Sequence, residues 1–391
     1  MSGLPTSPPP RSDTAAAAVA VIGVAGGGQL ARMMLPAAAR LGLDVVVLDP
    51  DPLCSAAPLA QGTVVGAFDS STALFELARR SDVVTFEIER IDAGVLRELE
   101  AAGHRVRPSA TTLEIIQDKL TQKEFLARHG VPTSGFCAYP RLDEGPPALP
   151  CVWKARRDGY DGRGVAVLRD AAALRALPTT PALLEDLVDI DYELAILVAR
   201  DTRGTLVHYP VVEIVMDPTA HVMDTVIAPA EVPAAIAARC RELAGVIAEA
   251  FAYVGILAVE YFVDRAGNVL VNEVSPRPHN SGHYTIEACA TSQFEQHLRA
   301  VAGLELGSAE LKAAAVTFNV LGAADTNGRP RYVGFDMHAE EDDVFVHCYD
   351  KPEVRPGRKM AHVTVLAATR AAAWDKAERV KRTIRVEGHD E

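Results

Sequence analysis

Short apolar runs alternate with amphipathic stretches in the first part of the chain. The apolar run Val19–Ile22 leads into a triple glycine, 26–28, and then into a helical apolar periodicity from Gln29 to Leu41. Two later apolar runs, Val45–Leu48 and Val83–Phe86, have the length of buried strands. A strand, a helix and a strand in close succession are typical of a βαβ unit. The pattern therefore predicts a parallel sheet, and ligands bind such sheets at the carboxyl-terminal ends of the strands.

Strands predominate in the rest of the chain. We expect helices at Asp118–His129, Ala234–Ala252 and Ala371–Val380. We expect strands at Cys151–Lys154, Val165–Leu168, Leu183–Leu187, Glu193–Ala199, Val207–Ile214, Ala258–Asp264, Val269–Val274, Ala314–Val320, Val344–Tyr349 and Met360–Leu366. The loop 157–164 contains three glycines within six positions, so we expect it to close over a ligand.

Changes in composition divide the chain into an extension and three structured parts. Residues 1–17 contain a proline cluster and no apolar segment followed by a cleavage signal, which indicates a disordered extension rather than a signal peptide. A chain of 391 residues is expected to form two or three domains. We expect them at 18–115, 116–310 and 311–385, with a lid at about 135–190 inside the second.

The two strands Ala258–Asp264 and Val269–Val274 form a predicted hairpin that carries a candidate pair of carboxylates. If the loop is 265–268, Asp264 pairs with Val269, and Glu260 then faces Glu273 at about 5 Å. Two carboxylates this close repel each other, and a divalent cation that also binds phosphate is the obvious partner. A surface hairpin with solvated acids is the alternative.

A polar segment follows the hairpin. Arg277 has the planar fork that suits a carboxylate, bicarbonate or phosphate. His279, Asn280, Ser281 and His283 come next, and a buried strand or a simple turn has no need of them. This segment favours a functional site over the solvated hairpin.

Charge and composition narrow the range of partners. With 52 acidic and 39 basic residues the formal charge is −13, which argues against nucleic acid or an anionic membrane surface as a partner. Hydrophobic residues make up 49% and charged residues 23%, as in ordinary globular proteins. No apolar run reaches the roughly 18 residues of a membrane span. Six scattered cysteines predict reduced thiols in a cytoplasmic protein.

The glycine turn has more than one interpretation. Residues 26–31, GGGQLA, fit the dinucleotide pattern G-x-G-x-x-A, and Asp49 lies 21 positions after Gly28, where an acid that binds ribose is expected. A nicotinamide-dependent oxidoreductase therefore stays open. The stiff acidic segment 49–52, DPDP, argues against it. Glycines required only for close packing of strand and helix are a further alternative.

Two groups of basic residues are candidates for binding phosphate. Lys119, Lys154 and the glycine loop 158–164 form one candidate group, since lysines beside a glycine loop suit a nucleotide triphosphate. The segment 349–360, YDKPEVRPGRKM, is densely basic in an acidic chain. A solvated helix lysine and a charged solvated turn are the alternatives for Lys119 and for this segment.

Together, several motifs resemble those of the ATP-grasp enzymes, and more narrowly those of the N5-carboxyaminoimidazole ribonucleotide synthase family. The motifs are GGGQL, FEIE, QDKLTQKEFL, DGYDGRG, NEVSPRPHNSGH, TSQFEQHLRA and the basic segment. RPHNSGH and YDK…RPGRKM are typical of this family rather than of ATP-grasp proteins in general. Ala31 and Ala361 replace expected glycines, and Arg90 follows FEIE where a neutral polar residue or His is usual. Ser275 stands where many ATP-grasp enzymes have a metal-binding Asn, so the predicted metal ligands are limited to Glu260 and Glu273.

The resemblance implies an α/β ATP-grasp fold with an N-terminal Rossmann-like domain and a small C-terminal β-rich cap. It implies a carbon–nitrogen ligase of purine biosynthesis, in which ATP phosphorylates bicarbonate and 5-aminoimidazole ribonucleotide is carboxylated at its amine. The implied cofactors are ATP and Mg²⁺, with two ions expected and Mn²⁺ as an alternative. The implied assembly is a homodimer.

The resemblance also implies roles for individual residues. The expected ATP-binding residues are Arg107, Lys119, Lys154, Glu185, Leu187, Val188, Glu193 and Asn272. The expected substrate-binding residues are Gln29, Glu87, Tyr160, Arg163, His279, Asn280, Ser281, Lys351, Arg358 and Lys359. The expected catalytic residues are Tyr160, Asp161, Arg277 and His283, with Asp161 accepting the proton of the amine. Another ATP-grasp ligase and a non-enzymatic nucleotide-binding protein remain alternatives.

Overall fold

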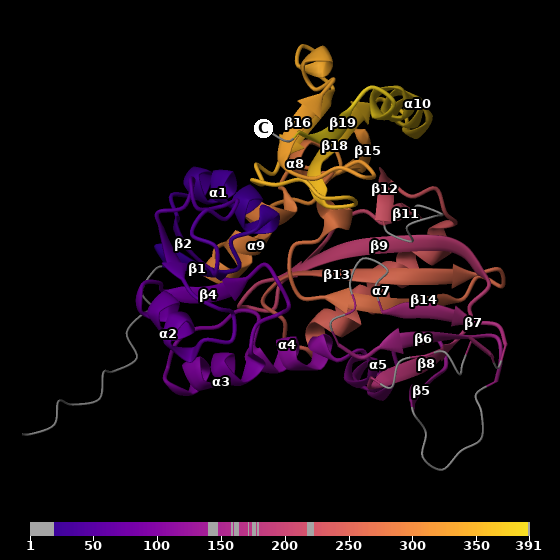
Figure 1. The fold of residues 1–391 in the computed structure, drawn as a ribbon. Helices are drawn as coiled ribbons and strands as arrows, with labels where there is room; N and C mark the ends of the chain where they lie inside the picture. The colour runs from indigo at the N-terminus through magenta and orange to yellow at the C-terminus, as the bar shows by residue number, and fades with distance from the viewer. Residues whose placement is uncertain are drawn as a thin grey trace, which may run out of the picture.

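The computed structural model describes residues 19–139, 148–157, 159, 164–170, 172–173, 177, 180–216 and 223–389. They form an N-terminal parallel sheet, a small lid sheet and a large sheet that continues into the C-terminal part (Figure 1). Within these ranges, no helix is both long enough and apolar enough to cross a membrane.

The N-terminal part is a parallel sheet with a hydrophobic core on each face. Its strands lie in the order β3-β2-β1-β4. They are β1 (Val21–Ala25), β2 (Asp44–Asp49), β3 (Gly62–Val65) and β4 (Val83–Phe86), with helices α1 (Gln29–Leu41), α2 (Ser71–Arg79), α3 (Ala93–Ala101) and α4 (Ala110–Gln117). Because β1 and β4 are neighbours, the glycine turn after β1 meets the loop after β4. The first strand begins at Val21, two residues later than predicted. Gly42 ends α1 in the left-handed conformation that glycine favours.

The lid follows α5 (Lys119–Arg128). Asp118 caps this helix by accepting the N–H of Leu120 at 3.1 Å, so the predicted helix Asp118–His129 is confirmed with its end residues as caps. The lid sheet is antiparallel, in the order β5-β8-β6-β7. Its strands are β5 (Phe136–Tyr139), β6 (Cys151–Ala155), β7 (Val165–Leu168) and β8 (Ala182–Asp186).

The large sheet runs in the order β14-β13-β9-β11-β12-β15-β18-β17, and β10 also pairs with β9. Its central strands and helices are β9 (Ile190–Arg200), β10 (Leu206–His208), β11 (Val212–Met216), β12 (Met223–Ala228), α7 (Ala234–Ala250), β13 (Gly255–Asp264), β14 (Val269–Ser275), α8 (Thr285–Ala288) and α9 (Gln293–Ala302). The single strand predicted at Val207–Ile214 is wrong. Its pairing with β9 is interrupted between β10 and β11, where Pro210 lacks an N–H to donate.

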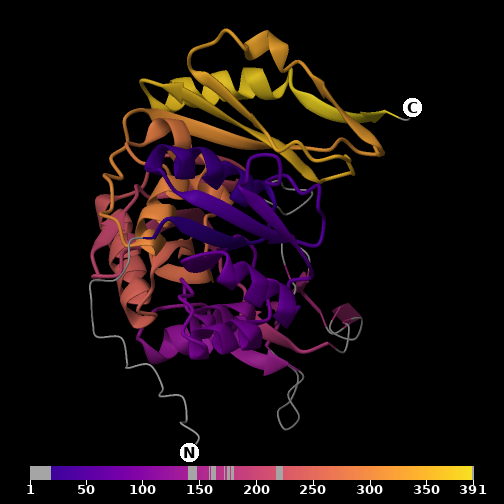
Figure 2. The ribbon, with the colours of Figure 1, turned by 90° about the vertical axis from the view of Figure 1, so that its left-hand side faces the viewer.

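The C-terminal part extends the large sheet, because β12 pairs with the first of its strands, and two further strands form a separate two-stranded sheet. Its elements are β15 (Ala314–Leu321), β16 (Arg329–Val333), β17 (Val344–Cys348), β18 (Lys359–Ala367), α10 (Arg370–Lys381) and β19 (Arg385–His389). Figure 2 shows this part lying over the N-terminal sheet. The β-rich cap predicted for the end of the chain is confirmed.

Helix α9 joins the N-terminal sheet to the large sheet. Phe294, Leu298 and Val301 are buried in the same core as α1 and β1. His297 reaches Thr85 of β4 at 2.8 Å and accepts the N–H of Ile256 of β13 at 3.2 Å. The two sheets are therefore held in one arrangement, with the polar segment after β14 between them.

Candidate active site

Strands β13 and β14 carry the predicted pair of carboxylates. Glu260 lies directly opposite Glu273, as predicted. The predicted pairing of Asp264 with Val269 is wrong, because Val263 pairs with Val269. The register shifts by one residue between these two points, so Asn272 is an extra residue in β14.

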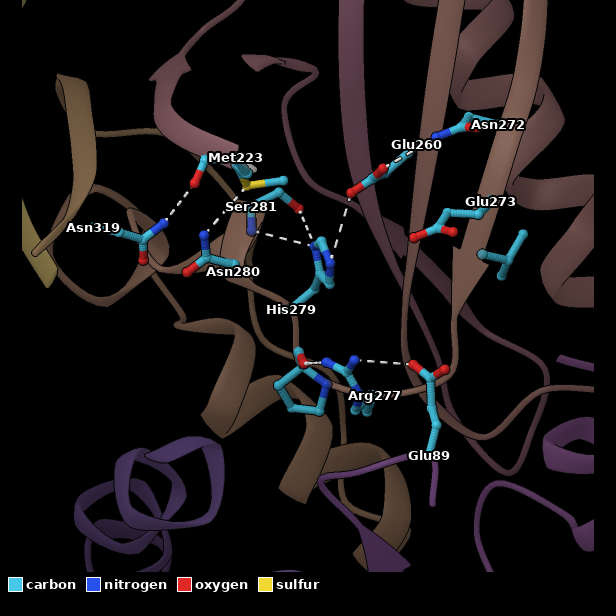
Figure 3. Close-up of polar contacts among 12 residues, drawn as sticks. Glu89, Met223, Glu260, Asn272, Glu273, Arg277, His279, Asn280, Ser281 and Asn319 are labelled. Atoms are coloured by element: carbon cyan, nitrogen blue, oxygen red, sulfur yellow. Dashed lines mark hydrogen bonds and ion pairs between the residues drawn. The ribbon is translucent and has the colours of Figure 1, made fainter. Parts of the chain in front are cut away.

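This bulge turns three polar side chains to one side of the sheet. Two residues of a bulged strand face a single residue of its neighbour, and here Asn272 and Glu273 face Glu260. The amide nitrogen of Asn272 lies 3.5 Å from Glu260 Oε2. Figure 3 shows the three side chains extending into the same space.

The two carboxylates differ in their surroundings. Lys119, at the start of α5, forms a hydrogen-bonded ion pair with Glu273 and lowers the pKa of that carboxyl. Burial, together with the charge of Glu273, raises the pKa of Glu260. Burial also disfavours the charge of Lys119, but Glu273 outweighs it and the pKa of Lys119 is raised. The positive charge of Lys119 offsets the repulsion between the two carboxylates at Glu273. A cation beside Glu260 would offset the same repulsion at Glu260.

Lys154 of β6 connects this pair to the lid. Its ammonium lies 3.0 Å from Asn272 Oδ1 and 3.1 Å from Glu185 Oε2. Glu185 is buried, and its Oε2 also accepts the hydroxyl of Ser134 at 2.7 Å. Its Oε1 is buried without a hydrogen-bond partner among the described residues. An open buried acceptor of this kind fits a ligand amino group.

Lys123 belongs to the same network and was missed by the sequence analysis. It lies four residues after Lys119 on α5, 3.2 Å from Glu185 Oε2 and 3.0 Å from Ser134 Oγ. Burial lowers the pKa of Lys123 to about 8. Burial alone would raise the pKa of Glu185, but Lys123 and Lys154 outweigh it and the pKa is lowered. The available signal was a second lysine one helical turn after the first.

The other candidates for the nucleotide lie along β8 and β9, with one exception. Leu187 and Val188 follow β8, and Leu187 is 37% exposed. Glu193 of β9 lies opposite Phe262, on the face that carries Glu260, and burial raises its pKa. Arg107 instead donates to the carbonyl oxygen of Val301 at the end of α9, at 2.6 Å.

Arg277 points from the end of β14 toward the N-terminal sheet (Figure 3). Its guanidinium lies 3.0 Å from Glu89 Oε1 and donates to the carbonyl of Pro278 at 3.1 Å. Glu89, in the loop after β4, was quoted in the FEIE motif but assigned no role. A guanidinium that already holds one carboxylate has the geometry to bind another small oxyanion.

His279 and Ser281 support each other beside Glu260. His279 Nδ1 lies 2.9 Å from Ser281 Oγ and accepts the N–H of Ser281 at 3.3 Å. Its Nε2 lies 3.7 Å from Glu260 Oε1. Asn280 contacts Met223 Sδ at 3.4 Å, and Asn319, which the sequence analysis missed, donates to the Met223 carbonyl at 2.9 Å (Figure 3).

His283 is the most deeply buried polar residue of the segment 277–283. This side chain is 0% exposed and lies behind the loop, with its ring tilted against that of His362 at 4.5 Å between centroids. Burial lowers its pKa well below the usual value, so the ring is neutral. In this arrangement the side chain has no exposed surface for a substrate to contact, so its predicted catalytic role stays a prediction.

Protein carboxylates occupy the glycine turn after β1. The N–H of Gly28 donates to Glu87 Oε1 at 3.0 Å, and the N–H of Gly27 donates to Asp49 Oδ2 at 2.9 Å. Burial raises the pKa of Glu87. A dinucleotide would need these N–H groups for its pyrophosphate and Asp49 for its ribose. The geometry therefore argues against the oxidoreductase alternative.

The basic segment 349–360 lies against the start of α1. The ammonium of Lys351 donates to Gln29 Oε1 at 2.7 Å and to the carbonyl of Lys359 at 2.6 Å. Arg358 donates to the carbonyl of Glu353 at 2.7 Å. The amino-terminal end of a helix favours an anion, and Lys351 adds a positive charge there.

Tyr160, Asp161 and Arg163 lie outside the described residues, so their predicted roles stay predictions. In the described ranges, no three His, Cys, Asp or Glu side chains come together as a metal site. Glu260 and Glu273 could hold a metal ion with further oxygen ligands from a nucleotide, since hard cations are often shared between carboxylates and phosphates.

Comparison with known protein families divides the chain into three matches. Residues 19–117 match the ribonucleotide synthetase preATP-grasp domain, and residues 124–294 match the ATP-grasp domain. Residues 315–376 match the phosphoribosylaminoimidazole carboxylase C-terminal domain.

Individual proteins resemble the chain over nearly its whole length. N5-carboxyaminoimidazole ribonucleotide synthase of Synechococcus elongatus is 38% identical over 370 residues, 92% of each chain. The crystal structure of the synthetase from Thermotoga maritima has a TM-score of 0.87 and 40% identity, and the match covers 95% of this chain and 100% of that one. The synthase of Aspergillus clavatus in complex with ADP and 5-aminoimidazole ribonucleotide has a TM-score of 0.82 and 33% identity, over 93% of this chain and 98% of that one.

Proposed function

The chain belongs to the N5-carboxyaminoimidazole ribonucleotide synthase family of ATP-grasp ligases, and from this premise we propose which of its residues carry each step. It is an enzyme of purine biosynthesis that uses ATP to convert 5-aminoimidazole ribonucleotide to the N5-carboxy compound. The observation that carries the proposal for the site is the Glu260–Glu273 pair, which meets Lys119 and, through Asn272, Lys154.

ATP is proposed to lie between the lid and the large sheet. Glu185 Oε1 would accept the amino group of adenine, since it is a buried acceptor without a partner in the described part of the chain. The main chain of Leu187 and Val188 would hold the base, and Glu193 the ribose. Lys119, Lys154 and Asn272 would face the phosphates. A role for Arg107 stays a prediction.

Mg²⁺ fits the carboxylate pair, and two ions are proposed there. Glu260 and Glu273 are the residues that would hold them, because among the described residues a lysine forms an ion pair with Glu273 and none does so with Glu260. Bound Mg²⁺ would neutralise the β- and γ-phosphoryl oxygens during transfer.

Bicarbonate is the proposed second substrate, and Arg277 would bind it. A bicarbonate oxygen attacks the γ-phosphorus, the bond to the ADP oxygen breaks, and carboxyphosphate forms. The amine of the ribonucleotide then attacks the carboxyl carbon and the bond to phosphate breaks. The nitrogen releases one proton, for which Asp161 is the predicted acceptor. Closure of the loop with Tyr160 and Arg163 would exclude water from carboxyphosphate.

The ribonucleotide is proposed to lie between the N-terminal sheet and the C-terminal part. Lys351 and Gln29 are in contact at the start of α1, which supports a site there for the 5′-phosphate with Arg358 and Lys359. Glu87, His279, Asn280 and Ser281 border the same space from the loops after β4 and β14. A homodimer remains a prediction, and a cytoplasmic location is consistent with six unpaired cysteines.

An assay of ADP release, coupled to a second enzyme, tests the proposal. Release should require the ribonucleotide and bicarbonate together, and equal rates without bicarbonate would contradict the carboxyphosphate step. Lys154→Met should raise KM for ATP about tenfold or more, because a phosphate-binding cation is lost. Lys376→Met is the matched control. Lys376 lies on α10 in the C-terminal part and, like Lys154, forms an ion pair with a glutamate, Glu341. Equal effects of both variants would contradict the role of Lys154.

A further inference from the structure

Three buried glutamines bind the main chain in the same unusual way. In each, the amide oxygen accepts the N–H of one residue and the amide nitrogen donates to the carbonyl of that same residue. Gln122 binds Val274 in this way at 3.0 and 3.2 Å, Gln293 binds His279 at 2.8 and 2.8 Å, and Gln296 binds Gly307 at 2.8 and 2.7 Å. All three side chains are buried. We call this arrangement a glutamine clamp.

Two of the clamps hold the end of β14 and the start of the loop after it, which carry the predicted site residues Glu273 and His279. β14 is the edge strand of the large sheet, so no strand in the described part of the chain pairs with the outward N–H and C=O of Val274, next to Glu273. Gln122 takes the place of that strand. Gln293 does the same for His279, which lies outside any strand and whose ring faces Glu260. The stretch from Val274 to His279 is thus fixed by a clamp at each end.

Gln293 uses every hydrogen-bonding group of its amide. The N–H of His279 is a donor, so the atom that accepts it is the amide oxygen and the other is the NH₂ group. The second N–H of that group points to His283 Nδ1 at 3.1 Å. His283 Nδ1 is therefore an acceptor, and its hydrogen lies on Nε2. Gln293 fixes the backbone of His279 and the tautomer of His283 together.

The loop is shaped around this amide. A Cβ on Gly282 would lie 2.5 Å from Gln293 Oε1 and 2.6 Å from its Cδ. The N–H of Gln293 also donates to Thr285 Oγ1 at 2.8 Å, and that hydroxyl donates to the carbonyl of Gly282 at 2.6 Å. The glycine of the HNSGH sequence thus permits the close approach that the clamp requires.

We infer that Gln293 is a positioning residue for the carboxylation, which it serves by clamping His279 in place beside Glu260. This inference rests on the proposed role of the loop 277–283 and deepens it. The hydrogen bonds that Gln293 forms among the described residues go to the loop and to α8, and none goes to a residue that binds ATP in the proposal. Loss of the clamp should therefore lower turnover and leave nucleotide binding intact.

The test replaces Gln293 by glutamate, which has the same shape and no N–H to donate. Gln293→Glu should lower kcat for ADP release with ribonucleotide and bicarbonate on the order of 10²-fold, as a displaced catalytic loop does. Calorimetric Kd for Mg-ADP should stay within about threefold of the wild type. Gln296→Glu is the matched control, because it removes an equivalent clamp of the same helix at Gly307, away from the site.

The outcomes are distinct. Loss of turnover in Gln293→Glu with retention in Gln296→Glu, at similar Tm, supports the inference. Equal loss in both variants, or full turnover in Gln293→Glu, overturns it. If Gln293→Glu does not fold, hydrogen exchange of the wild type decides. A clamped His279 amide should exchange slowly although it lies outside helices and strands. Fast exchange of this amide overturns the inference. A wild-type chain without ribonucleotide-dependent ADP release would contradict the proposed function instead.

Discussion

Acid should loosen the joint that α9 makes between the two sheets, because His297 is held there in its neutral form. His297 Nδ1 accepts the N–H of Ile256 at 3.2 Å, so its hydrogen lies on Nε2 and is donated to Thr85 Oγ1 at 2.8 Å. The side chain is fully buried, and burial lowers its pKa to about 3. A second proton would break the bond to Ile256 and place a charge in the core.

The size of the effect follows from the two pKa values. An unfolded histidine titrates near 6.5, so between about 3 and 6.5 the unfolded chain binds more protons than the folded one. The free energy of unfolding therefore falls as the pH falls through this window. Between pH 7 and pH 5 the loss from His297 alone is about 2 kcal/mol. This is a large share of a typical total of about 5–15 kcal/mol.

The variant His297→Gln removes this titration and retains a donor and an acceptor. Urea unfolding, followed by circular dichroism at pH 7 and pH 5, gives the loss of stability for each chain. The wild type should lose about 2 kcal/mol more than His297→Gln. His389→Gln, which removes an exposed histidine, should behave as the wild type. Equal losses in the wild type and His297→Gln would refute the reasoning.

Three further predictions concern the site. Glu273→Gln should lower ADP release with both substrates to below about one hundredth, because the carboxylate pair is lost, and full activity would end the metal assignment. Arg277→Lys keeps the charge but not the planar fork, so KM for bicarbonate should rise about tenfold while KM for ATP is unchanged; an unchanged KM for bicarbonate would contradict the proposed binding. Gly26→Ala should lower Tm by several degrees in a thermal melt, because Gly26 has φ 106° and a Cβ would lie 2.6 Å from Glu87 Cγ; an unaltered Tm would show that the turn can relax.

Local signals predicted much of the fold and part of the site. The strand Val83–Phe86 and the helix Gln29–Leu41 were located to the residue, because strand length and helical periodicity depend on neighbours in the chain. The pairing of Glu260 with Glu273 was predicted correctly, but from a loop length that was wrong. The loop is one residue longer than expected, and the bulge at Asn272 restores the register. The buried residues Val269, Val271 and Val274, spaced by two and then by three, were the signal for the bulge.

The sequence by itself determined the family, the order of the elements and the residues with charge and hydrogen-bonding capacity, because these depend on residue type and spacing. Only the tertiary structure decided which of those groups meet when they belong to different elements outside a single hairpin. The pairing of β12 with β15, the burial of His283, the carboxylates that fill the glycine turn and the clamps of Gln122 and Gln293 join residues far apart in the chain. A contact of that kind depends on how whole elements pack, and no local pattern records it.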